Sequence, residues 1–506
     1  MTLTVRLAST LLLASLAAPA SAVPRSASLP PPESSQALPD ENPSPDCVLP
    51  GDSRCEEWVG RHDVGTFESI ADIAASPTGD RVFAVGLNAP SPTPGNDIVT
   101  VAFDASNGSV LWTDRYNGPG SIQDFAQAIE VTPDGRTVIA AGTRDDVGIT
   151  ANRDDLVAVG YDAATGERRW VASFDSGRYD FTQDLAIAPD GSRFYLTALT
   201  RGTLGSPDMD YLTVGFDAAT GETLWSAREN SPNVGAGPDY ANAVAVSPDG
   251  DTVAVTGMWV IPASPQNTLT YGTVAYEAGD EERLGQRRWF TQHEIGVAKA
   301  LAFSPDGKRV HVAGEVVRPN GTVWDYGLVA FDTQTGQRLW ADRFNGCVNS
   351  CYLTSLAINP SNGDVYATGW ALVLKDPLGV SGSQTDLFTL AYRGDTGERR
   401  WLSQYDSLGL NQVFPEAFLA PDQSALVLAA ATQTSNRTFS TAVALDPATG
   451  EVRWEARHMP PGHIPMGNAT NGYGAISPNR LFIARAVADD PADSSNGKYV
   501  MTAYRL

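Results

Sequence analysis

The chain has 506 residues, of which 42% are hydrophobic, and its 59 acidic residues outnumber 35 basic residues for a formal net charge of -24. A chain of this length and apolar content can bury a large core. A polyanion repels phosphate backbones and anionic lipid, so the composition excludes nucleic-acid and membrane-surface binding and suits solubility, cationic ligands and divalent metals.

The N-terminal segment predicts export from the cytoplasm. Arg6 gives a short positive start, residues 7–18 form an apolar run too short to span a bilayer, and Ala20-Ser21-Ala22 is a small-residue cleavage site. We therefore expect residues 1–22 to be a cleaved signal peptide and the mature protein to be secreted, in an extracellular or periplasmic location. Residues 23–46 are rich in Pro and Ser and predict a disordered linker. No later run is apolar and long enough to predict a membrane span.

The four cysteines form two close pairs, Cys47 with Cys55 and Cys347 with Cys351. In a secreted chain they predict two disulfides, for which three connectivities are possible. Pairing within each close pair is favoured because short loops close at low entropic cost.

Two signals alternate along residues 47–506. The first is an apolar run that ends in a Pro-Asp-Gly turn and is followed by a second apolar run, as in residues 128–142. The second is a strand, a Thr-Gly turn and a strand that carries a tryptophan, as in residues 156–170. Both turns predict hairpins, because Pro fixes φ and Gly accepts a positive φ. The tryptophans of the second signal are Trp58, Trp112, Trp170, Trp225, Trp289, Trp340, Trp401 and Trp454.

The period of roughly 57 residues and the absence of helical periodicity predict repeated four-stranded antiparallel sheets. The chain ends at Leu506 in what aligns with a third strand, and residues 57–59 supply the missing fourth strand with Trp58. We therefore predict one all-β domain, an eight-bladed β-propeller whose ring is closed by the N-terminal strand. Closure removes the exposed sheet edge that an open array would leave.

The repeated unit Ala102-x-Asp104-x-x-x-Gly108-x-x-x-Trp112 resembles the tryptophan-docking motif of the pyrroloquinoline quinone (PQQ) dehydrogenase β-propellers. Residues 330–340 and 444–454 match it, Glu277 and Arg393 replace its Asp, and the copy ending at Trp289 contains an insertion. The resemblance covers the chain from about residue 58 and implies that each tryptophan packs between adjacent blades. The motif also occurs in relatives that bind no quinone, and we predict no cofactor.

Features that every blade shares indicate scaffold, whereas a binding site is expected where one blade departs from the others. Acidic residues recur directly before the third strands, and we interpret them as hydrogen-bonding groups and not as a metal ring. The short turns lie on one face of the predicted ring, which we call the turn face. The longer connections from second to third strand and between blades lie on the other, the loop face, where ligands are expected.

Five residues stand out at the predicted loop face. His458 and His463, with Met466 nearby, either ligate a soft metal or belong to an ordered loop with solvent-facing histidines. Lys299 either holds an anionic ligand beside the axis or is a solvated or salt-bridged lysine. Trp259 and Trp370 either stack on a planar ligand or sugar or pack at the rim. The pair Cys347 and Cys351 is interpreted as a loop staple and not as a redox site.

No catalytic constellation is visible, and the sequence leaves enzymatic activity open while favouring its absence. We expect a monomeric secreted scaffold that presents its loop face to a protein, a glycan or a cell-wall component. The alternative is a secreted quinoprotein dehydrogenase acting on alcohols or sugars, which would need PQQ and Ca²⁺.

Overall fold

The computed structural model of the protein describes residues 56–62, 68–88, 95–119, 123–145, 154–201, 209–230, 237–261, 268–318, 323–347, 350–374, 383–406, 411–433, 438–458, 464–465, 473–490 and 493–506. The predicted signal peptide, the predicted linker, Cys47, Cys55, His463 and Met466 lie outside these ranges. Within them all regular structure is β-strand, arranged as seven four-stranded sheets and one five-stranded sheet. None of the described residues forms a helix with the length and hydropathy needed to cross a bilayer.

Each sheet is one blade, and in blades 1 to 7 the strands follow one another in chain order from the inside outward. Blade 1 comprises β2 (Glu68–Ala75), β3 (Arg81–Asn88), β4 (Asp97–Asp104) and β5 (Val110–Tyr116). Blade 2 comprises β6 (Asp124–Val131), β7 (Thr137–Asp145), β8 (Asp154–Asp162) and β9 (Arg168–Phe174). Blade 3 comprises β10 (Tyr179–Ile187), β11 (Arg193–Arg201), β12 (Met209–Asp217) and β13 (Thr223–Glu229). Blade 4 comprises β14 (Tyr240–Val246), β15 (Thr252–Ile261), β16 (Thr268–Glu277) and β17 (Arg287–His293).

The second half of the chain repeats the arrangement. Blade 5 comprises β18 (Gly296–Phe303), β19 (Arg309–Val317), β20 (Trp324–Asp332) and β21 (Arg338–Phe344). Blade 6 comprises β22 (Cys351–Ile358), β23 (Val365–Leu374), β24 (Ser383–Tyr392) and β25 (Arg399–Tyr405). Blade 7 comprises β26 (Asn411–Leu419), β27 (Leu426–Gln433), β28 (Thr438–Leu445) and β29 (Val452–His458). Blade 8 comprises β31 (Tyr473–Ser477), β32 (Arg480–Asp490), β33 (Asp493–Arg505) and β1 (Glu56–His62), with the short β30 (Ile464–Pro465) also paired to β32.

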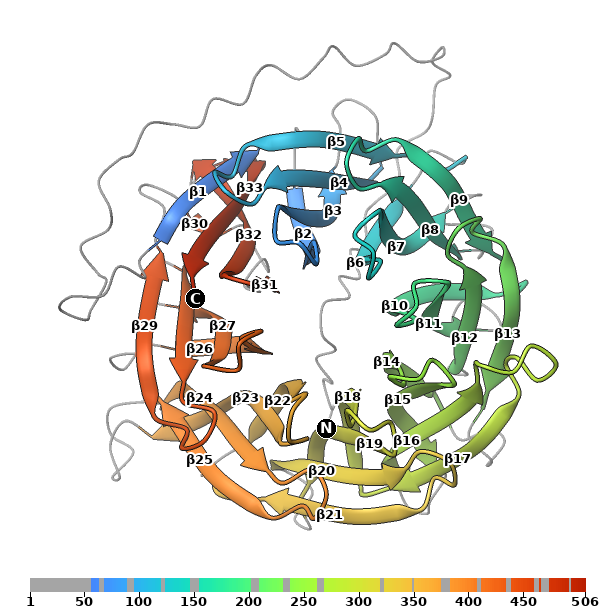
Figure 1. Cartoon of the computed structure of the whole chain (residues 1–506), viewed down its shortest axis with the longest axis vertical. Coiled ribbons are helices and arrows are strands. Elements are labelled where there is room, and N and C mark those ends of the chain that lie inside the picture. The colour runs from blue at the N-terminus through green and yellow to red at the C-terminus, as the bar shows by residue number, and fades with distance from the viewer. Residues whose placement is uncertain are drawn as a thin grey trace. The chain divides into compact units, whose positions relative to one another are not determined.

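The blades form a closed ring (Figure 1), and the region between the eight inner strands is called the central channel below. Each inner strand contacts the inner strand of the next blade, from β2 through β6, β10, β14, β18, β22 and β26 to β31, which contacts β2 again. The eight-bladed propeller predicted from the repeats is thus confirmed. The second and third strands are buried on both sides, since blades cover them on either face, and they are accordingly continuous apolar runs.

The N-terminal strand closes the ring as predicted. β1 pairs antiparallel with β33, with Trp58 opposite Ala503 and His62 opposite Tyr499. The Glu57 carboxylate adds ion pairs with Arg480 and Arg505 of the same blade. The last blade is therefore held together by residues from the two ends of the described chain.

The docking motif explains how adjacent blades are joined. The indole Nε1 of Trp112 in blade 1 donates a hydrogen bond to the carbonyl oxygen of Ala163 in blade 2, at 3.1 Å. The ring lies against Gly166, which has a φ of 75°, and a Cβ added at this glycine would lie only 2.5 Å from the indole. Glycine is needed there both for the left-handed turn and for the close approach of the indole. The same indole-to-carbonyl bond joins Trp58 to Ala105, Trp170 to Ala218, Trp289 to Thr333, Trp340 to Gly394 and Trp401 to Pro447.

Candidate functional site: the central channel and the loop face

The inner strands share an irregularity that the sequence did not reveal. In each of blades 1 to 6 the pairing of the first and second strands shifts by one residue at the same place. The second strand has a glycine opposite this bulge in most blades; at Gly142 an added Cβ would lie 2.0 Å from the carbonyl oxygen of Phe125. The extra residues are Ala71, Gln127, Gln183, Asn242, Lys299 and Thr354. Lys299 is therefore one of a series of mostly polar bulge residues on the strands around the channel.

In blades 1, 3 and 6 the residue after the bulge is polar, and its side chain binds the backbone of the next blade. In blade 1 the Asp72 carboxylate accepts the N–H of Ile73 at 2.8 Å and that of Ile129, in blade 2, at 2.9 Å. Asp184 in blade 3 makes the same two bonds, with the N–H groups of Leu185 and Val244. These side chains act as clasps between neighbouring inner strands.

Two further clasps lie on the other side of the ring. The Ser355 hydroxyl in blade 6 accepts the N–H of Ala417 in blade 7, and the Glu416 carboxylate in blade 7 accepts the N–H of Gly474 in blade 8. The Thr354 hydroxyl donates to the carbonyl oxygen of Pro415, also between blades 6 and 7. We call each boundary between adjacent blades a seam. Side-chain-to-backbone bonds at four of the boundaries between blades therefore reinforce the indole bonds nearer the rim.

Burial makes the clasp carboxylates unusually basic. Burial raises the pKa of Asp72 to about 7 and that of Asp184 to about 6, although main-chain N–H donors oppose the shift. Burial also raises the pKa of Glu130 and of Glu416 to about 8, and neighbouring carboxylates add to the rise. Across the channel in blade 5, burial raises the pKa of Glu315 to about 7 and the charge of Lys299 opposes it. The carboxyl groups of blades 7, 1, 2 and 3 are thus buried and electrostatically coupled to one another.

These carboxylates do not fit a calcium and quinone centre of the kind that the sequence resemblance raised as an alternative. Both oxygens of Asp72 and both of Asp184 already accept main-chain N–H groups. In the part of the chain that the structure describes, no three His, Cys, Asp or Glu side chains lie close enough together to hold a metal ion. The positions of Asp72 and Asp184 are therefore explained by their bonds to the main chain at the boundaries between blades.

The tryptophans proposed for ligand stacking are covered by other side chains. Trp259 is only 1% exposed and packs against Tyr211 and Phe290, with ring centroids 5.5 and 5.2 Å away. Of the two alternatives given for Trp259, packing is the one that agrees with its burial, because Tyr211 of blade 3 and Phe290 of β17 cover the indole. Trp370 is half-buried and stacks on Tyr352 at 4.2 Å, so one face of its indole is already occupied. His458 ends β29, and its side chain, like all of His463, lies outside what the structure describes, so the histidine hypothesis stays a prediction.

The disulfide between Cys347 and Cys351 is confirmed. It lies in the connection from blade 5 to blade 6, on the loop face, where Arg318 donates to the carbonyl oxygen of Cys347 at 2.7 Å. The same guanidinium binds Asp325 at 2.7 Å, and Arg343 binds the other oxygen of Asp325 at 2.9 Å. This corner of the loop face is therefore fixed by one covalent bond and a buried ion-pair network.

The acidic residues before the third strands form hydrogen bonds, as the sequence analysis expected, and four of the five bind a side chain of the fourth strand, whereas Asp155 binds Arg144 of the second strand. Asp325 binds Arg343, and the equivalent bonds join Asp97 to Arg115, Asp210 to Arg228, and Asp386 to Gln404. Each partner is three residues after the docking tryptophan of its blade. Their regular repetition identifies them as scaffold.

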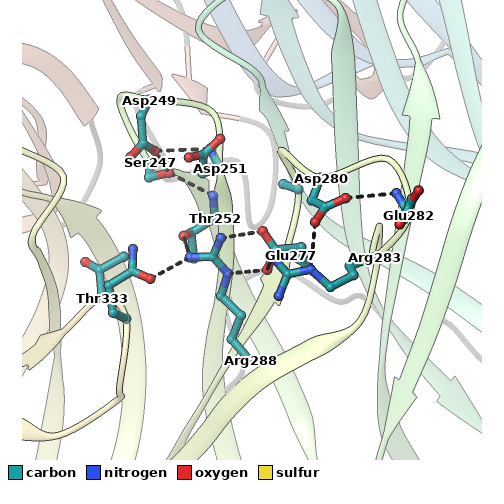
Figure 2. Close-up of polar contacts among 12 residues, drawn as sticks. Ser247, Asp249, Asp251, Thr252, Glu277, Asp280, Glu282, Arg283, Arg288 and Thr333 are labelled. Carbon is teal, nitrogen blue, oxygen red and sulfur yellow. Dashed lines mark hydrogen bonds and ion pairs between the residues drawn. The ribbon is translucent and has the colours of Figure 1, made fainter.

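Blade 4 departs from the repeat on the turn face, as Figure 2 shows. Glu277 replaces the motif Asp, and its carboxylate is bound by both Arg288 and Arg283. Arg288 also binds the Thr252 hydroxyl at 2.8 Å, while Arg283 reaches Asp280 in the insertion at 2.7 Å. In Figure 2 the charges of Glu277 and Asp280 are paired with those of Arg283 and Arg288, so these four side chains stabilise the insertion and have little free binding capacity.

The insertion removes one docking bond. Ala278 occupies the position whose carbonyl oxygen accepts the indole N–H at other seams, but here that oxygen accepts from the Arg193 guanidinium at 3.0 Å. The Nε1 of Trp225, which should bind there, is buried and has no hydrogen-bond partner. Trp225 nevertheless packs between blades, with Tyr195 and Tyr276 against its ring.

Fold and docking motif together define the class of protein, an eight-bladed propeller of PQQ-like repeats. The sequence matches the model of the family described as outer membrane protein assembly factor BamB, over residues 66–190 and 154–343, which together exceed half of the chain. The chain therefore belongs to this family of PQQ-like β-propeller proteins. A search of curated proteins finds no match.

Solved structures show the same fold at low sequence identity. Sqt1 from Chaetomium thermophilum superposes with a TM-score of 0.53 at 14% identity, covering 90% of this chain and 100% of that one. Sqt1 bound to the N-terminus of the ribosomal protein L10 gives 0.52 at 14% identity, with 88% and 100% covered. The quinohemoprotein alcohol dehydrogenase of Comamonas testosteroni gives 0.47 at 12% identity, with 89% and 76% covered.

Proposed function

We propose that the protein is a secreted, non-catalytic binding propeller that presents its loop face to a protein, glycan or cell-wall ligand. The observation that carries the proposal is that the channel carboxylates bind the main chain of neighbouring blades. In a catalytic or cofactor centre such groups converge on one reacting point, whereas Asp72, Asp184 and Glu416 each bind a main-chain amide of the next blade.

A rigid scaffold supports such a role. The scaffold is held by ring closure, by the indole bonds and by the disulfide at Cys347. These contacts reduce the conformational entropy that a surface loses when it binds a ligand. Sqt1, a propeller of similar fold, is known in complex with a peptide segment, and this supports the use of the architecture as a binding platform.

The test compares two activities of the chain from residue 23 onward. One arm titrates PQQ with Ca²⁺ and follows quinone absorbance and dye reduction with alcohols and aldose sugars. The other arm screens a glycan array and a displayed peptide library, using the chain and a variant with residues 458–463 replaced by Gly-Ser. Lys308→Ala, on the turn face, serves as the control. We expect saturable ligand binding that the control retains, and no dye reduction; saturable quinone binding with substrate-dependent reduction overturns the proposal.

A further inference from the structure

Where an outer strand begins with an arginine, this arginine usually forms an ion pair with the outer strand of the preceding blade. The outer strands follow one another around the ring, so the end of one lies beside the start of the next (Figure 1). Four of them have an arginine two residues before the docking tryptophan. At three of these seams the preceding outer strand supplies a carboxylate, and the pairs are Arg168 with Asp114, Arg287 with Glu229, and Arg399 with Asp342.

The seam between blades 4 and 5 has the arginine without the carboxylate. Arg338 begins β21, but the two positions of β17 that carry a carboxylate at other seams are Thr291 and His293. Among the described residues no carboxylate forms an ion pair with Arg338. Its guanidinium instead lies 3.5 Å from Nδ1 of His293, which leaves most of its five N–H donors available.

A pocket of about 370 Å³ lies at this seam. Its lining includes Arg338 from blade 5 and Ile261, Thr270, Gln292 and His293 from blade 4. This volume is at the lower end of the range for small-ligand sites, roughly 300–1,000 Å³. The pocket also includes Glu294 and Ile295, the two residues that link β17 to β18, and Ile295 is 53% exposed.

Two polar groups of the lining are buried and lack a hydrogen-bond partner, namely Nε2 of Gln292 and Nε2 of His293. The His293 side chain is only 9% exposed. The Glu294 carboxylate lies 3.5 Å from Nε2 of His293, too far for a normal hydrogen bond. Buried polar groups are nearly always hydrogen-bonded in folded proteins, so these two groups are donors that a ligand entering the pocket would satisfy.

The protonation state of His293 makes it a donor toward this pocket. Burial lowers the pKa of His293, and the charge of Arg338 adds to this while Glu294 opposes it, so the ring is neutral at neutral pH. Because Nδ1 faces the guanidinium, the single proton belongs on Nε2. The pocket thus presents three donors, on Arg338, Gln292 and His293, and one strong acceptor, the Glu294 carboxylate.

We propose that this seam pocket binds a neutral hydroxylated ring, a sugar unit of a glycan. A hydroxyl group both donates and accepts, so neighbouring hydroxyls of a sugar match a site that combines a carboxylate with guanidinium, amide and imidazole N–H groups. The charges of Arg338 and Glu294 balance, and the net charge of -24 disfavours a polyanionic ligand. Ile261 and Ile295 provide apolar surface for the C–H faces of the ring. The inference rests on the proposed binding function and names its ligand class.

The test uses the full mature chain on an array of neutral and uronic-acid glycans, followed by saturation-transfer NMR with the neutral glycans that bind. Arg338→Ala and Gln292→Met remove donors from the pocket, and Arg168→Ala is the matched control at a seam that has its carboxylate. We expect a neutral glycan to bind, the two pocket substitutions to weaken it at least about tenfold each, and the control to leave it unchanged. Melting curves establish that each variant is folded, and the exposed Arg338, which lacks an ion pair, is the substitution least able to disturb folding.

Three outcomes overturn the inference. These are the absence of neutral glycan binding, binding of uronic-acid glycans alone, and neutral binding that Arg338→Ala leaves unchanged. The third outcome, or a peptide ligand that binds elsewhere, leaves the proposed binding function standing. Substrate-dependent quinone reduction, in contrast, removes the proposed function itself.

Discussion

Trp225 and Trp289 form a matched pair that isolates the value of the docking hydrogen bond. Each indole packs between two blades, and each residue is 8% exposed. They differ in one bond, because Nε1 of Trp289 donates to the carbonyl oxygen of Thr333 at 2.7 Å while Nε1 of Trp225 has no partner. Replacing each by phenylalanine therefore removes the same apolar area but a hydrogen bond at only one site.

The expected difference follows from the net worth of a hydrogen bond. A protein hydrogen bond contributes about 0.5–1.5 kcal/mol net, and Trp289→Phe also leaves the oxygen of the buried Thr333 unpaired. We expect Trp289→Phe to lower the free energy of unfolding by about 1–3 kcal/mol more than Trp225→Phe, because Trp225→Phe also removes a buried donor that has no partner. Alanine removes the whole buried ring, and we expect about 3–5 kcal/mol at either position.

Urea unfolding followed by far-ultraviolet circular dichroism measures these changes without depending on the fluorescence of the residue that is replaced. The slope against urea must stay constant among the variants for the free energies to be comparable. An equal or larger loss for Trp225→Phe contradicts the assignment of the docking bond. A loss below about 1 kcal/mol for Trp225→Ala contradicts the packing role of the indole itself.

Three further changes test other parts of the structure. Burial raises the pKa of Glu416 to about 8 in the folded state, so the stability that Glu416 contributes falls as the pH rises from about 4.5 to 8. Glu416→Gln keeps an acceptor for the N–H of Gly474, and the stability of this variant relative to the unsubstituted protein should rise toward pH 8.5 in urea titrations. A difference that stays constant with pH would refute the shift. His311 is fully buried against Trp340, with both ring nitrogens lacking a hydrogen-bond partner, and burial lowers its pKa to about 3. The imidazole takes up a proton below about pH 6.5 in the unfolded state but not in the folded state, so the unsubstituted protein loses stability as the pH falls. The gain in unfolding free energy from His311→Phe should therefore be about 2 kcal/mol larger at pH 5 than at pH 7.5. A gain that does not depend on pH would exclude this linkage. Deleting residues 23–46 should leave the melting curve unchanged, but deletion through Val64 removes β1 and should cause aggregation; a soluble monomer with an unchanged melting curve would argue against closure by β1.

The sequence was sufficient for the architecture because the repeat is governed by local rules. Pro-Asp-Gly and Thr-Gly turns fix the hairpins, and Gly166 must be glycine for reasons that hold in every copy. Ring closure followed from counting strands at the two ends of the repeat region. The acidic residues before the third strands were interpreted correctly because their repetition was visible.

The clasps and the seam pocket were missed because they depend on contacts between blades. Asp72 and Asp184 are acidic residues inside otherwise apolar inner strands, a signal that was present, but their partners lie in the next blade. The pocket could be found only by comparing equivalent positions at different seams. Arg338 stands out only when Thr291 and His293, which follow Trp289, are compared with the carboxylates at the same positions of other outer strands. The sequence left the role of Trp259 open for the related reason that the residue covering it, Phe290, lies on the outer strand of the same blade.

The closed ring makes a departure at one seam inexpensive. An exposed ion pair such as that of Arg168 with Asp114 contributes only about 0–1 kcal/mol, and the indole of Trp289 still joins blades 4 and 5 through its bond to Thr333. Losing the carboxylate opposite Arg338 therefore costs little stability and leaves an arginine and two unsatisfied donors around a pocket. A repeated scaffold held by several independent contacts at each seam can in this way gain a binding site at one seam while the others keep the ring closed.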